Sequence, residues 1–126
     1  MLEIDITKLE ETVAQTKSLL KDGLLATDIW DKETGLSLAG VNPQPEATAL
    51  FNVLTIEMQN TLTGSGFPGL SRYYILDLQD SNMVVVQRHR DDLMSGMLLD
   101  ARQTNLGILV SVAIPRYALG VEQARN

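Results

Sequence analysis

Apolar and polar residues follow several different periods along the chain, and the pattern from 45 to 62 is the least ordinary of them. Wound as a helix at about 100° per residue, this segment has one apolar side. That side holds Ala47, Leu50, Phe51, Leu54, Met58 and Leu62. Ala49, Val53 and Ile56 fall on nearly the opposite side. Because a small domain can cover only one side of a helix with its own sheet, the second side requires another helix or another chain.

Two explanations fit the second apolar side of this helix. Its residues could pack under the first or last helix of the same chain, or they could contact another subunit. The first and last helices are each predicted to have one apolar stripe, which packing on a sheet would satisfy. Since Asn52, Gln59 and Asn60 flank the second side, we interpret it as a helix interface with a polar margin. A symmetric pair of chains is the simplest partner.

The segment before this helix predicts a helix and a hairpin. Thr7 and Glu10 have the spacing of a capping box, so a helix is expected to begin at Thr7. Its apolar stripe comprises Leu9, Val13, Thr16 and Leu20. Residues 24–30 and 36–41 are typical of two strands joined by a tight turn in which Gly35 takes a positive φ. Pro45 suits the first turn of the middle helix.

The second half of the chain predicts three strands and a last helix. Residues 72–78 and 83–89 form a hairpin around a turn at 80–82, and a third strand covers 93–101. Thr104 is the expected N-cap of the last helix. The stripe of that helix comprises Leu106, Leu109, Val110, Ala113, Tyr117 and Val121. Because the stripe continues across Pro115, we expect one kinked helix. We therefore predict an α/β (α+β) fold, helix, two strands, helix, three strands, helix, in one domain over residues 1–126.

Charge and composition narrow the possible functions. The chain has 16 acidic and 10 basic residues and a net charge of −6, which disfavours nucleic acids and anionic membranes as partners. It has no cysteine, which excludes disulfides, thiolate catalysis and cysteine-bound metals. The start lacks the features of a signal peptide, and the longest nearly apolar run, 106–115, is far shorter than the roughly 18 residues of a membrane span. We expect a cytoplasmic protein without membrane insertion.

Three groups of residues could in principle carry chemistry. Gly64, Gly66 and Gly69 match a dinucleotide fingerprint, but that motif requires a strand before it and a helix after it. The order here is helix, loop, strand, which indicates a connector. His89 is the only histidine, and we expect it at a solvated strand end. With no Gly-x-Ser-x-Gly elbow in the chain, we predict no catalytic residues and no enzyme activity.

The third group is acidic and lies near the first hairpin. Asp28, Asp31 and Glu33 could offer oxygen ligands to a divalent cation. They lack the spacing of a calcium-binding loop, and carboxylates beside a turn are more often solvated caps. We therefore predict no metal site and no cofactor.

The order of elements, together with two short motifs, resembles the Roadblock family of dynein light chain roadblock-type domains. The motifs are Ala49-Leu50-Phe51-Asn52 on the middle helix and Thr104-Asn105-Leu106-Gly107 at the start of the last one. The resemblance spans residues 9–121 and is to bacterial, GTPase-interacting members. It implies a five-stranded antiparallel sheet sandwiched by helices. It also implies that two subunits pair through the middle helix and the strand after it, joining their sheets.

For function, the resemblance implies a non-catalytic homodimer that regulates or tethers a small Ras-like GTPase, or acts as an adaptor. In bacterial members the paired helices face the GTPase. Carried over to this chain, the pairing surface comprises Ala49, Val53, Ile56, Asn60, Arg72, Tyr74 and Leu76. Pro115 and the bulky run Phe51-Asn52-Val53 depart from the family pattern. The alternative is a monomeric sensor domain of PAS or profilin-like shape, with a small molecule between sheet and helix.

Overall fold

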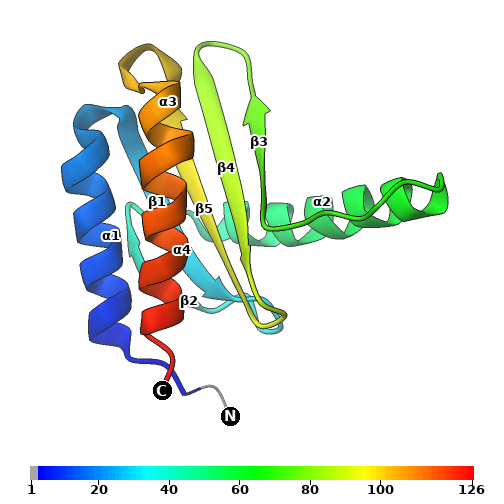
Figure 1. Ribbon diagram of the computed structural model, residues 1–126, viewed down its shortest axis with the longest axis horizontal. Helices are drawn as coiled ribbons and strands as arrows, with labels where there is room; N and C mark the ends of the chain where they lie inside the picture. Colours follow the sequence, from blue (N-terminus) through cyan, green and yellow to red (C-terminus); the bar gives the residue numbers. More distant parts are fainter. Residues whose placement is uncertain (1–2) are drawn as a thin grey trace.

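A computed structural model describes residues 3–126 and shows one antiparallel sheet with helices on both faces (Figure 1). The helices are α1 (Ile6–Leu20), α2 (Pro45–Gly64), α3 (Leu106–Ile108) and α4 (Ile114–Gln123). The strands are β1 (Leu24–Asp31), β2 (Ser37–Val41), β3 (Tyr73–Asp77), β4 (Asn82–His89) and β5 (Leu93–Asp100). The predicted fold class and the predicted order of elements are confirmed.

The sheet has the strand order β2-β1-β5-β4-β3, with every neighbouring pair antiparallel. At its centre, Met97 of β5 lies opposite Thr27 of β1 and Val85 of β4. β3 is an edge strand that pairs only with β4, as in the pair Tyr74 and Val86. An edge strand offers a row of backbone N–H and C=O groups to a further strand.

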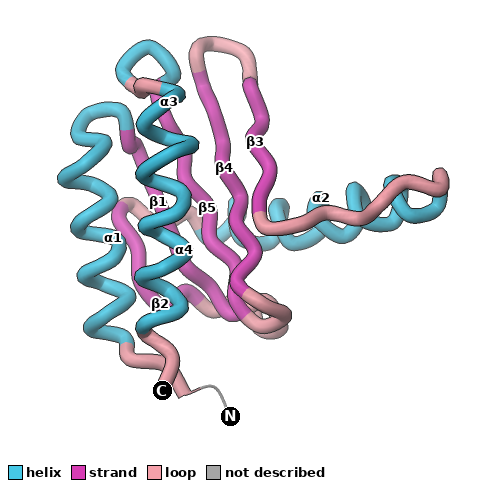
Figure 2. Tube along the Cα trace, in the orientation of Figure 1, coloured by secondary structure: helices cyan, strands magenta, loops and turns pink. Residues whose placement is uncertain are grey.

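α1 and α4 lie side by side over one face of the sheet and build the main core there (Figures 1 and 2). The predicted stripe of the first helix is confirmed, because Leu9, Val13, Thr16 and Leu20 are all buried. Tyr117 of α4 is fully buried, and its hydroxyl lies 2.9 Å from the hydroxyl of Thr27. The part of this face over β1, β2 and β5 is therefore closed by residues of the same chain.

Both helix starts differ from the sequence prediction. Asp5 caps α1, because its Oδ1 accepts a hydrogen bond from the Lys8 amide at 3.2 Å, so Thr7 already lies inside the helix. Asn105 caps α3 through the Ile108 amide at 3.0 Å. Thr104 instead donates its hydroxyl to the Asp100 carbonyl at 2.8 Å. In both cases an Asp or Asn side chain, which is a strong N-cap acceptor, occupies the cap.

The last helix runs on through Pro115 with a π turn at Leu109–Ala113 directly before it. A proline within a helix lacks an N–H and crowds the preceding turn, and a wider turn accommodates both effects. The π turn also rotates the first part of the helix. Leu106 and Val110 are 55% and 38% exposed, so their predicted place in the buried stripe is wrong. The remaining stripe residues are buried as predicted: Leu109, Ala113, Tyr117 and Val121.

Candidate interaction site on α2 and β3

α2 lies on the other face of the sheet, alone, and is oriented very differently from α1 and α4. It crosses the sheet and continues well past the edge strand β3, as the green helix in Figure 1 shows. A loop over 65–72 then returns the chain to β3. Because the last turns of α2 lie beyond the sheet, no strand of this chain covers them.

A polar stripe attaches α2 to the sheet, beside the packing of Phe51 on the sheet. The indole Nε1 of Trp30 on β1 donates to Asn52 Oδ1 at 2.9 Å. The hydroxyls of Thr55 and Tyr74 on β3 lie 2.8 Å apart. Gln59 Oε1 accepts from the Leu70 amide at 2.7 Å. These three contacts hold α2 across the sheet from β1 to β3 and, through Leu70, to the loop beyond the sheet edge.

The sequence interpretation missed this stripe. It placed Asn52 and Gln59 at the margin of an interface, but both side chains form hydrogen bonds within the chain. Thr55, which it did not consider, is buried. A signal was present, since residues 52, 55 and 59 recur at the spacing of one helix face.

Because the polar stripe faces the sheet, apolar residues on both sides of α2 remain accessible. Leu50, Val53 and Ile56 are 58%, 54% and 53% exposed, and Ala49 and Asn60 are also exposed. On the side expected under the sheet, Leu50 is exposed, but Phe51 packs against the sheet, and the other apolar residues of that side are half-buried: Ala47, Leu54, Met58 and Leu62. The explanation that Val53 and Ile56 lie under the first or last helix is wrong, because those helices cover the opposite face of the sheet (Figure 1).

The predicted residues on and near β3 lie close to α2. Tyr74 and Leu76 are half-buried and pack with Trp30 and Val84 in the small apolar cluster on the α2 face of the sheet. Burial raises the pKa of Tyr74, and its hydrogen bond with Thr55 opposes this shift. Arg72 is exposed just before β3. The structure thus brings residues of α2 and β3 together at one end of the sheet, next to its open edge.

An open cavity of about 300 Å³ lies on the same face, at the N-terminal end of α2. Apolar lining comes from Trp30, Phe51, Val84 and Leu98. Asp28 also lines the cavity, and burial raises the pKa of its carboxyl group although the Ser37 hydroxyl donates to it at 2.5 Å. A further cavity of about 240 Å³ lies between the sheet and α2 and is lined by Thr55, Gln59 and Met94 among others.

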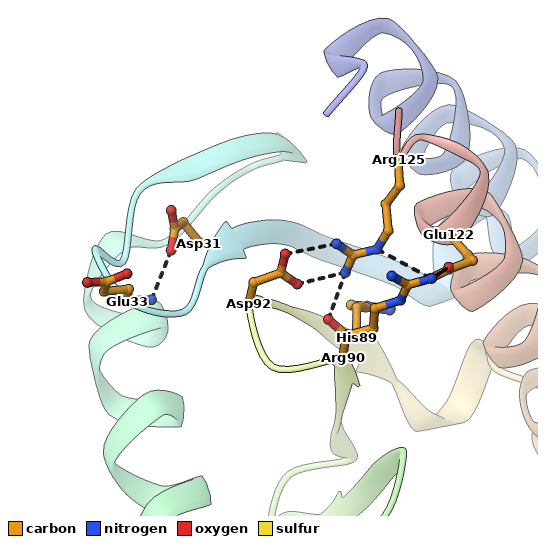
Figure 3. Close-up of polar contacts among 7 residues, drawn as sticks. All are labelled: Asp31, Glu33, His89, Arg90, Asp92, Glu122 and Arg125. Carbon is orange, nitrogen blue, oxygen red and sulfur yellow. Dashed lines mark hydrogen bonds and ion pairs between the residues drawn. The ribbon is translucent and has the colours of Figure 1, made fainter. Parts of the chain in front are cut away.

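His89 is not solvated, which corrects the sequence prediction. It is 6% exposed, its Nε2 lies 2.8 Å from the Ser95 hydroxyl, and its ring stacks on Tyr117. Burial lowers the pKa of His89 to about 4, and the nearby positive charge of Arg125 adds to this. The end of β4 is covered because Arg125 binds both Asp92 carboxylate oxygens, at 2.7 and 2.8 Å, and the His89 carbonyl (Figure 3).

The acidic residues of the first hairpin do not converge on one point. Asp31 Oδ1 accepts from the Glu33 amide at 2.9 Å and so caps the turn (Figure 3). Asp28 instead bonds to Ser37. Within residues 3–126 there is no group of three His, Asp or Glu side chains placed to hold a metal ion. The glycines at 64, 66 and 69 lie at the end of α2 and in the loop before β3, so the predicted order of helix, loop and strand is confirmed.

Solved structures with this fold include MglB and Roadblock/LC7 domains. Myxococcus xanthus MglB superposes with a TM-score of 0.76 at 13% identity, covering 100% of this chain and 96% of that one. A Roadblock/LC7 domain from Streptomyces avermitilis gives 0.59 at 12% identity, covering 90% and 92%. Schizosaccharomyces pombe profilin gives 0.58 at 12% identity, covering 91% and 94%. The predicted resemblance to the Roadblock family is thus confirmed in the fold.

The likeness to these proteins is one of structure and is not detected in the sequence. No protein-family model matches the chain, and no curated protein matches it. No helix of the described part is long and apolar enough to cross a membrane. At these identities the likeness defines the Roadblock/profilin type of fold, and function must be argued from the surface of the molecule.

Proposed function

We propose that the protein is a non-catalytic cytoplasmic homodimer that pairs through α2 and β3 and binds a small Ras-like GTPase with its paired α2 helices. One observation carries the proposal. α2 extends past the sheet edge and keeps three large apolar residues, Leu50, Val53 and Ile56, more than half exposed within two helical turns. Large apolar side chains gathered on an unpartnered helix are typical of protein interaction sites.

The open edge of the sheet supports pairing at the same place. β3 has a hydrogen-bonded neighbour on one side only. If β3 pairs with its copy about a two-fold axis, the two sheets join and the unpaired backbone groups become bonded. In the same arrangement each α2 would extend over the partner's sheet. The apolar sides with Ala49, Val53 and Ile56 would then be removed from water.

The GTPase is the partner that the Roadblock resemblance implies, and the MglB-like fold supports that choice. Such a dimer would act by binding one nucleotide state of the GTPase more tightly, which is the only way a ligand shifts a conformational equilibrium. We do not favour the small-molecule sensor. A ligand in the cavity beside Phe51 would leave Val53 and Ile56 uncovered, and a ligand in the cavity beside Thr55 would still leave Val53 uncovered.

Substitution on α2 tests the dimer. Val53→Asp and Ile56→Asp should each convert a dimer to a monomer near 13.9 kDa, because pairing would have to desolvate a carboxylate without a partner. The chain should still fold, since both positions are solvent-exposed in the single chain. Sedimentation measures mass, and circular dichroism measures folding.

Leu36→Asp is the matched control for these substitutions. Leu36 is 65% exposed but lies at the turn between β1 and β2, on the side of the sheet opposite the edge strand β3. This variant should sediment like the wild type. A wild type that is monomeric at micromolar concentration would refute the dimer, as would an Ile56→Asp variant that remains dimeric.

A pull-down in two nucleotide states tests the proposed binding to a GTPase. A pull-down with the wild-type protein as bait is performed on lysate loaded with GDP or with a non-hydrolysable GTP analogue. A regulator should recover a Ras-like GTPase preferentially in one state, and Val53→Asp should abolish recovery. Equal recovery in both states would favour the adaptor role. Recovery of no GTPase in either state would contradict the proposed partner.

A further inference from the structure

A second open groove lies on the other face of the sheet, between α4 and the strands β3 and β4. Its volume is about 380 Å³. In Figure 1, α1 and α4 cover β1, β2 and β5, whereas β3 and the outer side of β4 have no helix over them. The apolar lining includes Tyr73 of β3 and Val110 and Leu119 of the last helix. Leu119 is 56% exposed.

The uncovered area is an open strip beside α4. It comprises β3 and the outer side of β4, because α4 contacts the rest of β4, where Gln87 donates to the Ile114 carbonyl. On the covered half of this face, α1 already packs beside α4 in the same way. A partner segment lying beside α4 would therefore contact Val110 and Leu119 on the wall of the groove.

Gln87 gives a second, independent sign of an occupant. It lines the groove and is only 3% exposed. Its Nε2 donates to the Ile114 carbonyl at 3.1 Å, but its buried Oε1 has no hydrogen-bond partner among the described residues. A buried acceptor without a donor is unfavourable. A bound segment that carries a neutral donor, such as a hydroxyl or an indole N–H, would satisfy it.

The charge of the groove specifies the occupant further. Arg72 and Arg90 contribute positive charge to its lining, where Glu122 is the only acidic residue. The Arg88 guanidinium instead donates to the Leu70 carbonyl in the loop after α2. Glu122 is already bonded to Arg90 and Arg125 (Figure 3). The groove is thus locally positive on a chain whose net charge is −6. Acidic side chains along the edges of the occupant would complement it.

We propose that this groove binds an amphipathic helix of a partner protein that has one apolar face, acidic edges and a neutral hydrogen-bond donor. The helix lies against β3 and β4 beside α4. Because the groove is on the face opposite α2 and is complete in one chain, it does not depend on pairing through α2. A dimer joined at β3 leaves it open and presents two copies.

The probe for this proposal is a phage-displayed library of 20-residue helix-forming peptides. It is selected on the wild-type protein after depletion on the Leu119→Glu variant. Enriched peptides should share an apolar stripe at i, i+3, i+4 and i+7, with Asp or Glu beside it. One synthetic peptide is then labelled, and its affinity is measured by fluorescence anisotropy, with circular dichroism to check that each variant folds.

Two substitutions at one exposed position separate charge from packing. Leu119→Glu should weaken binding by at least about tenfold, because a like charge then faces the acidic peptide. Leu119→Lys removes the same apolar contact but should weaken binding much less. Val53→Asp on α2 should leave the affinity unchanged, which separates this site from the proposed GTPase surface.

Three outcomes would overturn the proposal. The first is a selection that enriches no peptide. The second is a peptide that binds the Glu and Lys variants equally well. The third is a change in sedimentation caused by either Leu119 variant, which would assign the groove to contact between copies of this chain.

Discussion

The two faces of the sheet are built by opposite means. On the face covered by α1 and α4, fully buried apolar residues such as Leu9, Leu109 and Val121 form one continuous core. On the face crossed by α2, side-chain hydrogen bonds hold the helix, and the apolar cluster beneath it is small. Burial of apolar area is the main source of folding free energy. The first face therefore stabilises the fold, and the second leaves apolar surface available for contact with other molecules.

The way α2 is attached also controls its accessibility. A helix with an apolar stripe toward the sheet would bury its hydrophobic residues and present polar ones. Here Asn52 and Thr55 take the inner positions, so Leu50 and Ile56 lie toward solvent on either side. Direction and position come from hydrogen bonds, which are specific in geometry but contribute only about 1 kcal/mol each. Such attachment orients a binding helix while leaving its apolar residues free.

Replacing a leucine by alanine on each of the two faces should give the largest difference in the free energy of unfolding. Leu109→Ala, at a fully buried position within the π turn, should reduce the free energy of unfolding by about 2–5 kcal/mol, since it leaves a cavity. Leu50→Ala, at a position 58% exposed on α2, should change it by less than about 0.5 kcal/mol. Urea unfolding at a concentration where the protein is monomeric measures both. Equal losses would show that the α2 face is closed in the single chain.

Acid should weaken the closed face through His89. Its folded pKa of about 4 lies below the unfolded value of 6.5, so its neutral form stabilises the fold above pH 6.5. That contribution declines as pH falls from 6.5 to about 4 and amounts to roughly 3 kcal/mol. Urea unfolding at a series of pH values measures it.

His89→Gln is the control for this pH dependence, because it removes the titrating ring. Its slope of stability between pH 6.5 and 4 should be much smaller than that of the wild type. Asp28 acts in the opposite direction on the α2 face, since its raised pKa favours folding as pH falls. The hydrogen bond from Arg125 lowers the pKa of Asp92. The ionised Asp92 carboxylate therefore stabilises the fold, and this stabilisation is lost only at pH values below the usual pKa range of an aspartate. Identical slopes in the two proteins would contradict the role of His89.

The smallest effect should come from the hydrogen bond between Thr55 and Tyr74. Thr55→Val and Tyr74→Phe should each reduce the free energy of unfolding by about 1 kcal/mol, and the double variant should show a coupling of about 0.5–1.5 kcal/mol. Hydrogen exchange of the α2 amides should become faster in all three variants. Coupling near zero would mean that this bond does not hold α2 on the sheet.

Local pattern determined which segments become helices and strands. Apolar stripes, prolines and turn residues act within a few positions of themselves, so the stripe of α1, the hairpins and the long middle helix could be predicted from residues alone. The caps were misplaced by one or two residues because Asp5 and Asn105, which lie close to the expected threonines, accept from the Lys8 and Ile108 amides instead. The π turn was missed because its effect on Leu106 and Val110 depends on a shift of register that periodicity does not show.

Which side of α2 faces the sheet was decided only by tertiary structure. The sequence displays two apolar sides and a polar stripe between them, and each is compatible with a helix. The choice depended on Trp30 and Tyr74, which place an indole N–H and a hydroxyl where Asn52 and Thr55 can reach them. The same holds for His89, which is buried because Arg125, 36 residues away, closes over the end of its strand. Contacts between distant residues have no local pattern, so only the folded chain reveals that α2 keeps its apolar sides accessible.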